Sequence, residues 1–165
     1  MRRIFSCVVM AVLLLIGFIS HSCRKDNEII LDKKVIFTIL DDHHGWGSDS
    51  DTTMFSSGLI NFDKTDYSSI DSIFFVISNL KTLDYYGKDI QKTVSIELFD
   101  LSNNVSIEHS RITTDDVKIS QFKITQNLIT HLPSSPINIG IRVINADKNN
   151  CYWELHAASL ILKRL

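Results

Sequence analysis

The feature that most constrains the fold of this chain is the alternation of apolar and polar residues in its longer apolar segments. In TVSIELF (residues 93–99), Val94, Ile96 and Leu98 occupy every second position, and INIGIRV (137–143) repeats the pattern. Successive side chains of a β-strand point to opposite faces of a sheet, so this period predicts half-buried strands with one dry face. Helical spacing is scarce, and the whole chain contains only four alanines.

Continuous apolar runs predict the central strands. The segments KVIFTIL (34–40) and SIFFVIS (72–78) contain few polar positions, which is typical of strands that are covered on both faces. The turn LSNN precedes a further predicted strand at 105–112.

Two segments change phase, because their apolar positions switch from one face to the other. In VKISQFKI (117–124) the change predicts a bulge or two short strands. In the last segment (151–163) it falls at Ala157–Ala158, where a bulge would turn both apolar sets, including Trp153, into the core. The best helical candidate is TQNLITHLPSSP (125–136), which is only about two turns long and contains a proline that stops it.

About eight short strands separated by turn-rich gaps are typical of a sandwich or a barrel. We favour an all-β fold, with a two-sheet antiparallel β-sandwich over residues 34–165. The length of the chain, 165 residues, predicts one such domain.

The first residues are organised differently. Two arginines are followed by an apolar run from Ile4 to Ile19 and then by small polar residues, which is the order of a secretory signal peptide. The run is shorter than the about 18–20 residues of a usual spanning helix. We therefore predict a signal helix within residues 1–22, in preference to an uncleaved N-terminal anchor.

The end of this segment, ISHSC (19–23), resembles the lipobox of bacterial lipoproteins in the looser form found in Bacteroidota. The resemblance implies that Cys23 is lipidated and becomes the first residue, with a tether at 23–33. Two or three acyl chains would anchor the protein stably. The following RKDNE resembles the signal that sends such lipoproteins to the cell surface, which implies an exported protein on the outer membrane.

Charge and cysteine content argue against a nucleic-acid-binding protein and against a disulfide-stabilised domain. Seventeen basic residues stand against 19 acidic ones, and this balance gives no electrostatic footprint for nucleic acid. If Cys7 leaves with the signal and Cys23 carries lipid, Cys151 is the remaining cysteine, and no internal disulfide can form. The core must then be held by packing alone.

From Ile60 onward, INFDKTDYSSIDSIFFVISNLKT resembles the strand–turn–strand opening of jelly-roll modules in secreted bacterial proteins. The spacing of the later segments is similar to the later strands of such modules. The resemblance implies a jelly-roll-like sandwich, a fold that commonly binds carbohydrate and also serves as an inert scaffold.

The segment LDDHHGWGSDSDTT (40–53) has the residue types of a metal site. Asp41, Asp49 and Asp51 offer hard oxygens that suit calcium. The adjacent His43 and His44 suit transition metals, but on a strand they would face opposite sides and could not share one ion. The sequence favours a solvated loop after the first strand, and the alternatives are calcium at the aspartates and, after it, a transition metal.

Aromatic residues suggest a ligand platform. Trp46 lies between two glycines, which would let its ring project from a loop, and Tyr85 and Tyr86 in LDYYGKD could extend the surface. Exposed rings of this kind can stack on the apolar face of a sugar. Alternatively, Trp46 folds back to cap the sandwich.

Two smaller motifs concern modification. DTT (51–53) and DSI (71–73) resemble the Bacteroidota O-glycosylation consensus. Thr52, expected in an exposed loop, is the better candidate, and Ser72, which enters a buried strand, is the worse.

Catalysis has little support, because G-x-S-x-G and H-E-x-x-H are both missing from the sequence. We therefore expect a lipid-anchored, non-catalytic binding or accessory module of the bacterial envelope, with carbohydrate as the favoured ligand. The alternative is a structural or adhesive surface protein that binds a protein partner.

Overall fold

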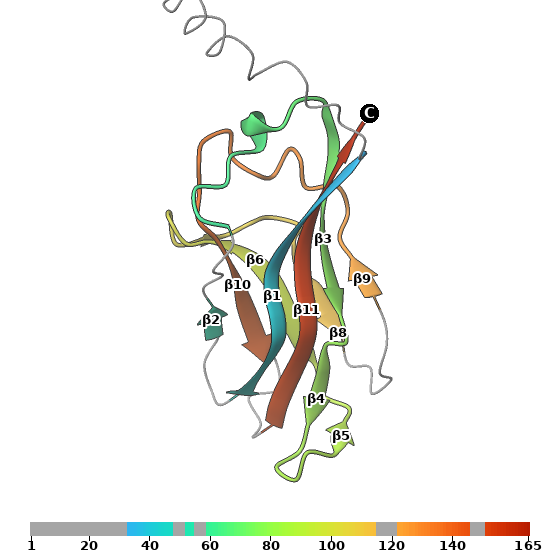
Figure 1. Cartoon of the computed structure of the whole chain (residues 1–165). Coiled ribbons are helices and arrows are strands. Elements are labelled where there is room, and N and C mark those ends of the chain that lie inside the picture. Colours follow the sequence, from blue (N-terminus) through green and yellow to red (C-terminus); the bar gives the residue numbers. More distant parts are fainter. Residues whose placement is uncertain (1–32, 48–51, 55–58, 115–121, 146–150) are drawn as a thin grey trace, which may run out of the picture. The chain divides into compact units, whose positions relative to one another are not determined.

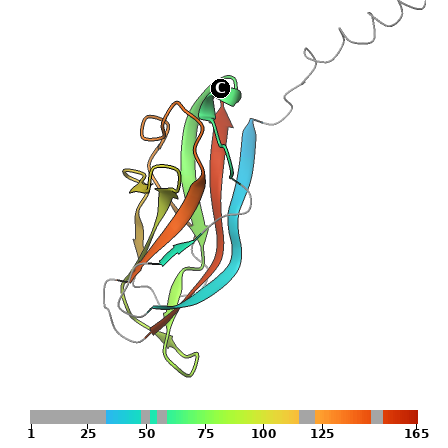
Figure 2. The same ribbon diagram turned by 90° about the vertical axis from the view of Figure 1, so that its left-hand side faces the viewer.

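Two antiparallel sheets pack face to face and form a β-sandwich of the jelly-roll type, as the sequence predicted (Figures 1 and 2). The computed structural model describes residues 33–47, 52–54, 59–114, 122–145 and 151–165, with backbone alone for 42–47, 52–54, 114, 145 and 151. Lys33–Leu165 form one unit. The predicted signal helix and tether lie outside the described residues.

The first sheet is built around the longest strands of the chain. In spatial order its members are β5 (Asp89–Ile90), β4 (Lys81–Leu83), β11 (Cys151–Arg164), β3 (Ile70–Ser78) and β9 (Phe122–Ile124), with β1 (Lys34–Gly47) also paired to β11. Strand β11 pairs with β1 along one side, and with β4 and then β3 along the other.

The second sheet has β6 at its centre. It contains β2 (Thr52–Met54), β10 (Ile139–Asn145), β6 (Val94–Asp100) and β7 (Val105–Ser106) in that order, with β8 (Ile112–Thr114) also paired to β6. A short 3₁₀ turn, η1 (Lys64–Asp66), lies in the connection from β2 to β3.

Alternating apolar side chains from the two sheets fill the space between them. The fully buried members at the centre of each sheet are Ile73, Phe75 and Ile77 of β3, Val94, Ile96 and Leu98 of β6, and Ile139, Ile141 and Val143 of β10. Burial of each such side chain contributes about 1.5–3 kcal/mol, so the period of two in the sequence determines which face of each sheet is the core.

The predicted change of phase in β11 is confirmed. Trp153 and Leu155 are buried on one side of it, and Ala158, Leu160 and Leu162 on the other. The irregularity in the ladder appears in the partner strand, where the register of β1 shifts between Thr38 and Leu40 opposite Ala158. Such a shift lets both apolar sets of β11 face the core.

The two apolar runs behave differently from one another. Strand β3 lies between β11 and β9, as expected for a central strand. Strand β1 has β11 as its one paired neighbour among the described residues, and Ile36 in it is 53% exposed. The prediction of a central strand at 34–40 was therefore wrong. The strand also continues to Gly47, so residues 41–47 are not the loop that the sequence suggested.

The predicted strand at 105–112 is divided into β7 and β8. The chain loops out between them, with His109 at a φ of 60°. Ser110 is fully buried, and its hydroxyl accepts a hydrogen bond from Leu98 N (3.0 Å) and donates one to Ile107 O (2.6 Å). A side chain thus replaces the missing partner of the β6 backbone, which allows the strand to break without an unpaired buried amide.

The two-turn helix expected at 125–136 was also wrong. Leu132 N donates to Leu128 O (3.1 Å), which closes a single helical turn that does not continue. Leu128 and Leu132 are buried and anchor this turn to the core. No helix in the described part of the chain is long and apolar enough to cross a membrane.

The two ends of the β1–β11 ribbon have different neighbours. Lys34 pairs with Lys163 at one end, close to the C-terminus (Figure 1). Gly47 pairs with Cys151 at the other end, where β11 also joins the β4–β5 hairpin.

Candidate functional site

The β4–β5 hairpin exposes two adjacent aromatic rings. Tyr85 is 71% and Tyr86 is 89% exposed, and their ring centroids lie 5.5 Å apart in an edge-to-face arrangement. Both residues stand in the turn between the two strands, so their side chains are displayed at a tip of the first sheet.

Hydrogen bonds from Asp84 order this turn. Its carboxylate accepts from Tyr86 N (2.9 Å) and Lys88 N (2.8 Å), and its carbonyl accepts from Gly87 N (3.0 Å). Gly87 has a φ of 78°, a conformation that glycine adopts without the strain of a side chain. The turn therefore fixes the backbone that carries both tyrosines.

Trp46 lies at the same end of this sheet. Its backbone pairs with Tyr152 of β11, and Tyr152 pairs on its other side with Leu83 of β4, two residues before Tyr85. Segments 39 residues apart in the chain are thereby brought within two strands of one another. Trp46 belongs to β1, which corrects the prediction that it projects from a loop.

The predicted calcium ligands are only partly described. Asp41 is exposed and lies within β1 opposite Ala157, while Asp49 and Asp51 fall outside the described residues. His43 and His44 are consecutive residues of the same strand, opposite Leu155 and Glu154. The convergence of carboxylates needed for calcium thus remains a prediction.

Of the two predicted glycosylation sites, one lies where the sequence predicted and the other does not. Thr52 begins β2 and pairs with Val143, so it stands in a strand and not in the open loop that was expected. Ser72 is 6% exposed in β3, as the sequence indicated. Cys23 falls outside the described residues, and Cys151 is the first residue of β11.

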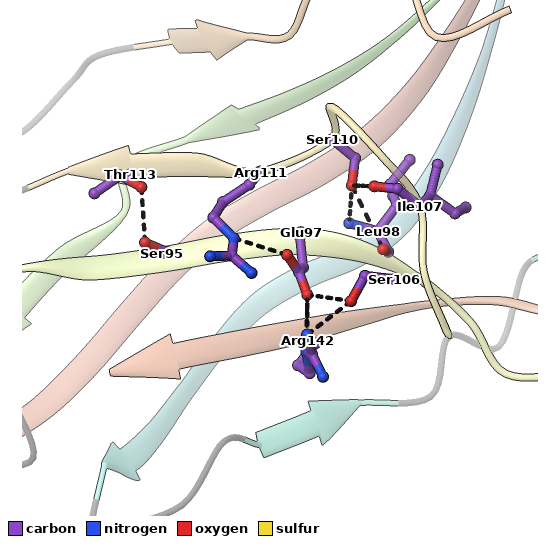
Figure 3. Close-up of polar contacts among 9 residues, drawn as sticks. All are labelled: Ser95, Glu97, Leu98, Ser106, Ile107, Ser110, Arg111, Thr113 and Arg142. Atoms are coloured by element: carbon purple, nitrogen blue, oxygen red, sulfur yellow. Dashed lines mark hydrogen bonds and ion pairs between the residues drawn. The ribbon is translucent and has the colours of Figure 1, made fainter. Parts of the chain in front are cut away.

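A polar cluster that the sequence did not predict lies on the second sheet. It is formed by Glu97, Ser106, Arg111 and Arg142 (Figure 3). The Glu97 side chain is 3% exposed. Its Oε1 accepts from Ser106 Oγ (2.6 Å) and Arg142 Nε (2.8 Å), and its Oε2 accepts from Arg111 Nε (2.8 Å). The Arg142 guanidinium also lies 5.0 Å from the centre of the Phe99 ring.

The electrostatics of this cluster favour the ionised carboxylate. Burial raises the pKa of Glu97, but hydrogen bonds from Ser106, Arg111 and Arg142 lower it by more, so the pKa lies below its usual value of 4.5. Both carboxylate oxygens are already bonded to protein groups. The cluster is suited to holding β6, β7 and β10 together, and a general acid or base would need a more accessible oxygen.

A second cluster that the sequence did not predict joins two surface loops. Glu108 and His109 come from the loop between β7 and β8, and His131 comes from the turn at 128–132. The imidazole centroids of His109 and His131 lie 4.4 Å apart, and His131 Nδ1 is 3.7 Å from Glu108 Oε2. Only the fold brings these residues together, since 22 residues separate the two histidines in the chain.

No protein-family model matches the sequence, and no curated protein does. Among solved structures, the chain is similar to the protein in the crystal structure of the infectious bursal disease virus VP2 subviral particle. That match has a TM-score of 0.38 and 10% identity, and it covers 79% of this chain and 32% of the viral one. The structure of the Gx strain of the same virus gives a TM-score of 0.38 and 13% identity, over 81% and 33%. The chain thus spans about a third of the length of these viral proteins.

Proposed function

We propose that this chain is a lipid-anchored, non-catalytic binding module of the bacterial envelope, and that its ligand is carbohydrate. The observation that carries the ligand assignment is the exposed pair Tyr85 and Tyr86 on an ordered turn. The anchor rests on the lipobox-like segment that ends at Cys23.

The physical argument concerns the cost of leaving these rings in water. Full burial of a large aromatic side chain contributes about 1.5–3 kcal/mol, and neither tyrosine obtains that gain in the sandwich. A ring carried on an ordered backbone turn loses less conformational entropy when a ligand stacks on it than a ring on a mobile loop. A sugar offers an apolar face for the ring and hydroxyl groups for the phenol oxygens.

The test is a double variant, Tyr85→Ala with Tyr86→Ala, in a polysaccharide pull-down and glycan array. We expect binding to fall at least about tenfold, which corresponds to about 1.4 kcal/mol. The melting temperature should stay unchanged, since both side chains are exposed.

The matched control is Phe122→Ala, which removes an aromatic ring that is 80% exposed in β9. This variant should bind sugar as the unmodified chain does. Equal binding by the tyrosine variant, or an array with no bound glycan for the unmodified chain, contradicts the carbohydrate assignment.

A protein-binding role is the second candidate, and the edge strand β9 favours it. This strand pairs with β3 as its one strand partner among the described residues, and its Phe122 and Ile124 are 80% and 58% exposed. An unpaired edge can accept a strand from another chain, and flanking apolar side chains add contact area.

For this candidate we expect Phe122→Lys to abolish co-purification of a stoichiometric protein partner. A charge on an edge strand disfavours the addition of another strand. The Tyr85→Ala, Tyr86→Ala variant serves as control and should retain the partner. A partner that remains bound to the Phe122→Lys variant argues against the β9 edge as the interface.

A further inference from the structure

The cluster of Glu108, His109 and His131 has the composition of a transition-metal site. Each residue offers one ligand atom, and these atoms all lie within 4.8 Å of one another. Two imidazoles and one carboxylate are a ligand set that zinc accepts, whereas calcium prefers oxygen alone. On this geometry we propose that Glu108, His109 and His131 bind Zn²⁺.

The ligand atoms need to move only slightly closer together to bind a zinc ion. Bond lengths of about 2.0–2.1 Å in a tetrahedral zinc site put neighbouring ligand atoms roughly 3.3 Å apart. His131 Nδ1 and Glu108 Oε2 are already 3.7 Å apart. Glu108 can supply the remaining movement, because its side chain is 82% exposed and meets little steric resistance.

Buried hydrogen bonds of the neighbouring residue fix the loop that carries His109. Ser110, the next residue, is fully buried and bonded to the backbone of Leu98 and Ile107. The preceding residue, His109, has a φ of 60°, a conformation that is uncommon for a residue with a side chain. The backbone position that carries the first imidazole is therefore set by the fold before any ion arrives.

Side-chain hydrogen bonds also fix the backbone of the turn that carries His131. Lys64 Nζ donates to Ile129 O (2.7 Å) and Leu132 O (2.5 Å). The side-chain oxygen of Asn127 accepts from Ile129 N (3.1 Å) and from Ile73 N (2.9 Å) of β3. Preorganised ligands lower the cost of binding an ion.

Three protein ligands leave one tetrahedral position for water or another ligand atom, as in zinc sites with an open position. The same set would accept Cu²⁺ or Ni²⁺, which bind imidazole well. The site is separate from the tyrosine pair, so it stands or falls independently of the carbohydrate proposal.

The first test is titration of the purified full chain in detergent with Co²⁺, a spectroscopic substitute for Zn²⁺. We expect one cobalt per chain with the visible absorption of a tetrahedral site, and displacement by Zn²⁺. The ligand variants are His109→Asn, His131→Gln and Glu108→Gln. Asparagine tolerates the positive φ of position 109, and Glu108 is exposed, so these two changes should leave the metal-free melting temperature unaltered. The His131 side chain is 23% exposed, so for His131→Gln the metal-free melting temperature is measured to establish that the variant is folded.

Loss of a group that only orients a metal ligand typically costs 10–100-fold in metal affinity, so loss of a ligating imidazole itself should cost at least about tenfold. The matched control is His43→Ala with His44→Ala, which removes the one pair of adjacent histidines in the sequence. Retained cobalt absorption in this control and its loss in the His109 and His131 variants support the site. Unchanged affinity in those two variants, or loss of binding in the control, overturns it.

Discussion

The variant Glu97→Gln should unfold with a free energy about 3 kcal/mol lower than that of the unmodified chain. Removing one partner of a buried ion pair costs about 3–5 kcal/mol, because the remaining charge is left uncompensated. We expect the lower end of that range, since the Arg111 side chain is 54% exposed and can turn to water. Arg142 is more enclosed, at 26%. Denaturant unfolding measures this difference, and the melting temperature should fall by about 10 °C.

Acidification should remove the same stabilisation. The pKa of Glu97 is lower in the folded state than its usual value of 4.5, so its contribution is complete above that pH and is lost as the pH falls through the folded pKa. The difference between Glu97→Gln and the unmodified chain should therefore be full at neutral pH and shrink as the pH falls below 4.5 and through the lowered pKa of Glu97.

Glu154→Gln provides the matched control, because Glu154 is 44% exposed in its ion pair with Lys81. An exposed pair of this kind contributes about 0–1 kcal/mol. If both variants unfold at the same denaturant concentration, the Glu97 cluster does not stabilise the second sheet as its burial indicates.

The second large effect is expected at Cys23. Cys23→Ala should abolish labelling of the protein by a fatty-acid analogue and release it from the membrane fraction. Stable anchoring needs at least two acyl chains or an equivalent second signal, and in a bacterial lipoprotein this cysteine carries all of them.

Cys151→Ala is the control for that experiment, since Cys151 lies at the start of β11 and far along the sequence from the lipobox-like segment. This variant should keep both the label and the membrane association. Labelling that persists in Cys23→Ala would remove the lipoprotein assignment and leave the sandwich without an anchor.

The sandwich could be predicted from sequence because one physical effect, apolar burial, decides it. The period of two in β6 and β10 places their isoleucines, leucine and valines on one face, and these side chains are the core. The change of phase in β11 could be predicted for the same reason. By contrast, the apolar run in β1 did not reveal that this strand lies at an edge with Ile36 exposed.

The polar clusters could not be predicted because their partners are distant in sequence. Alternation placed Glu97 on a polar face, which indicates water, yet that residue is 2% exposed. Its partners Arg111 and Arg142 are 14 and 45 residues away. The pairing of Glu108 and His109 with His131 likewise depends on a broken strand and a single turn, two features that sequence analysis predicted as a continuous strand and a helix.

The antiparallel β1–β11 ribbon has a consequence for the design of fusion proteins under the proposed lipid anchor. The predicted tether enters β1 at Lys34, beside Lys163 and the C-terminus, while the β4–β5 hairpin joins β11 at its opposite end. Fourteen residues of β1 span about 45 Å at roughly 3.3 Å per residue. If Cys23 carries the proposed anchor, a bulky group fused after Leu165 would lie at the anchored end of the ribbon, beside the start of β1, whereas the two tyrosines would lie toward the opposite end.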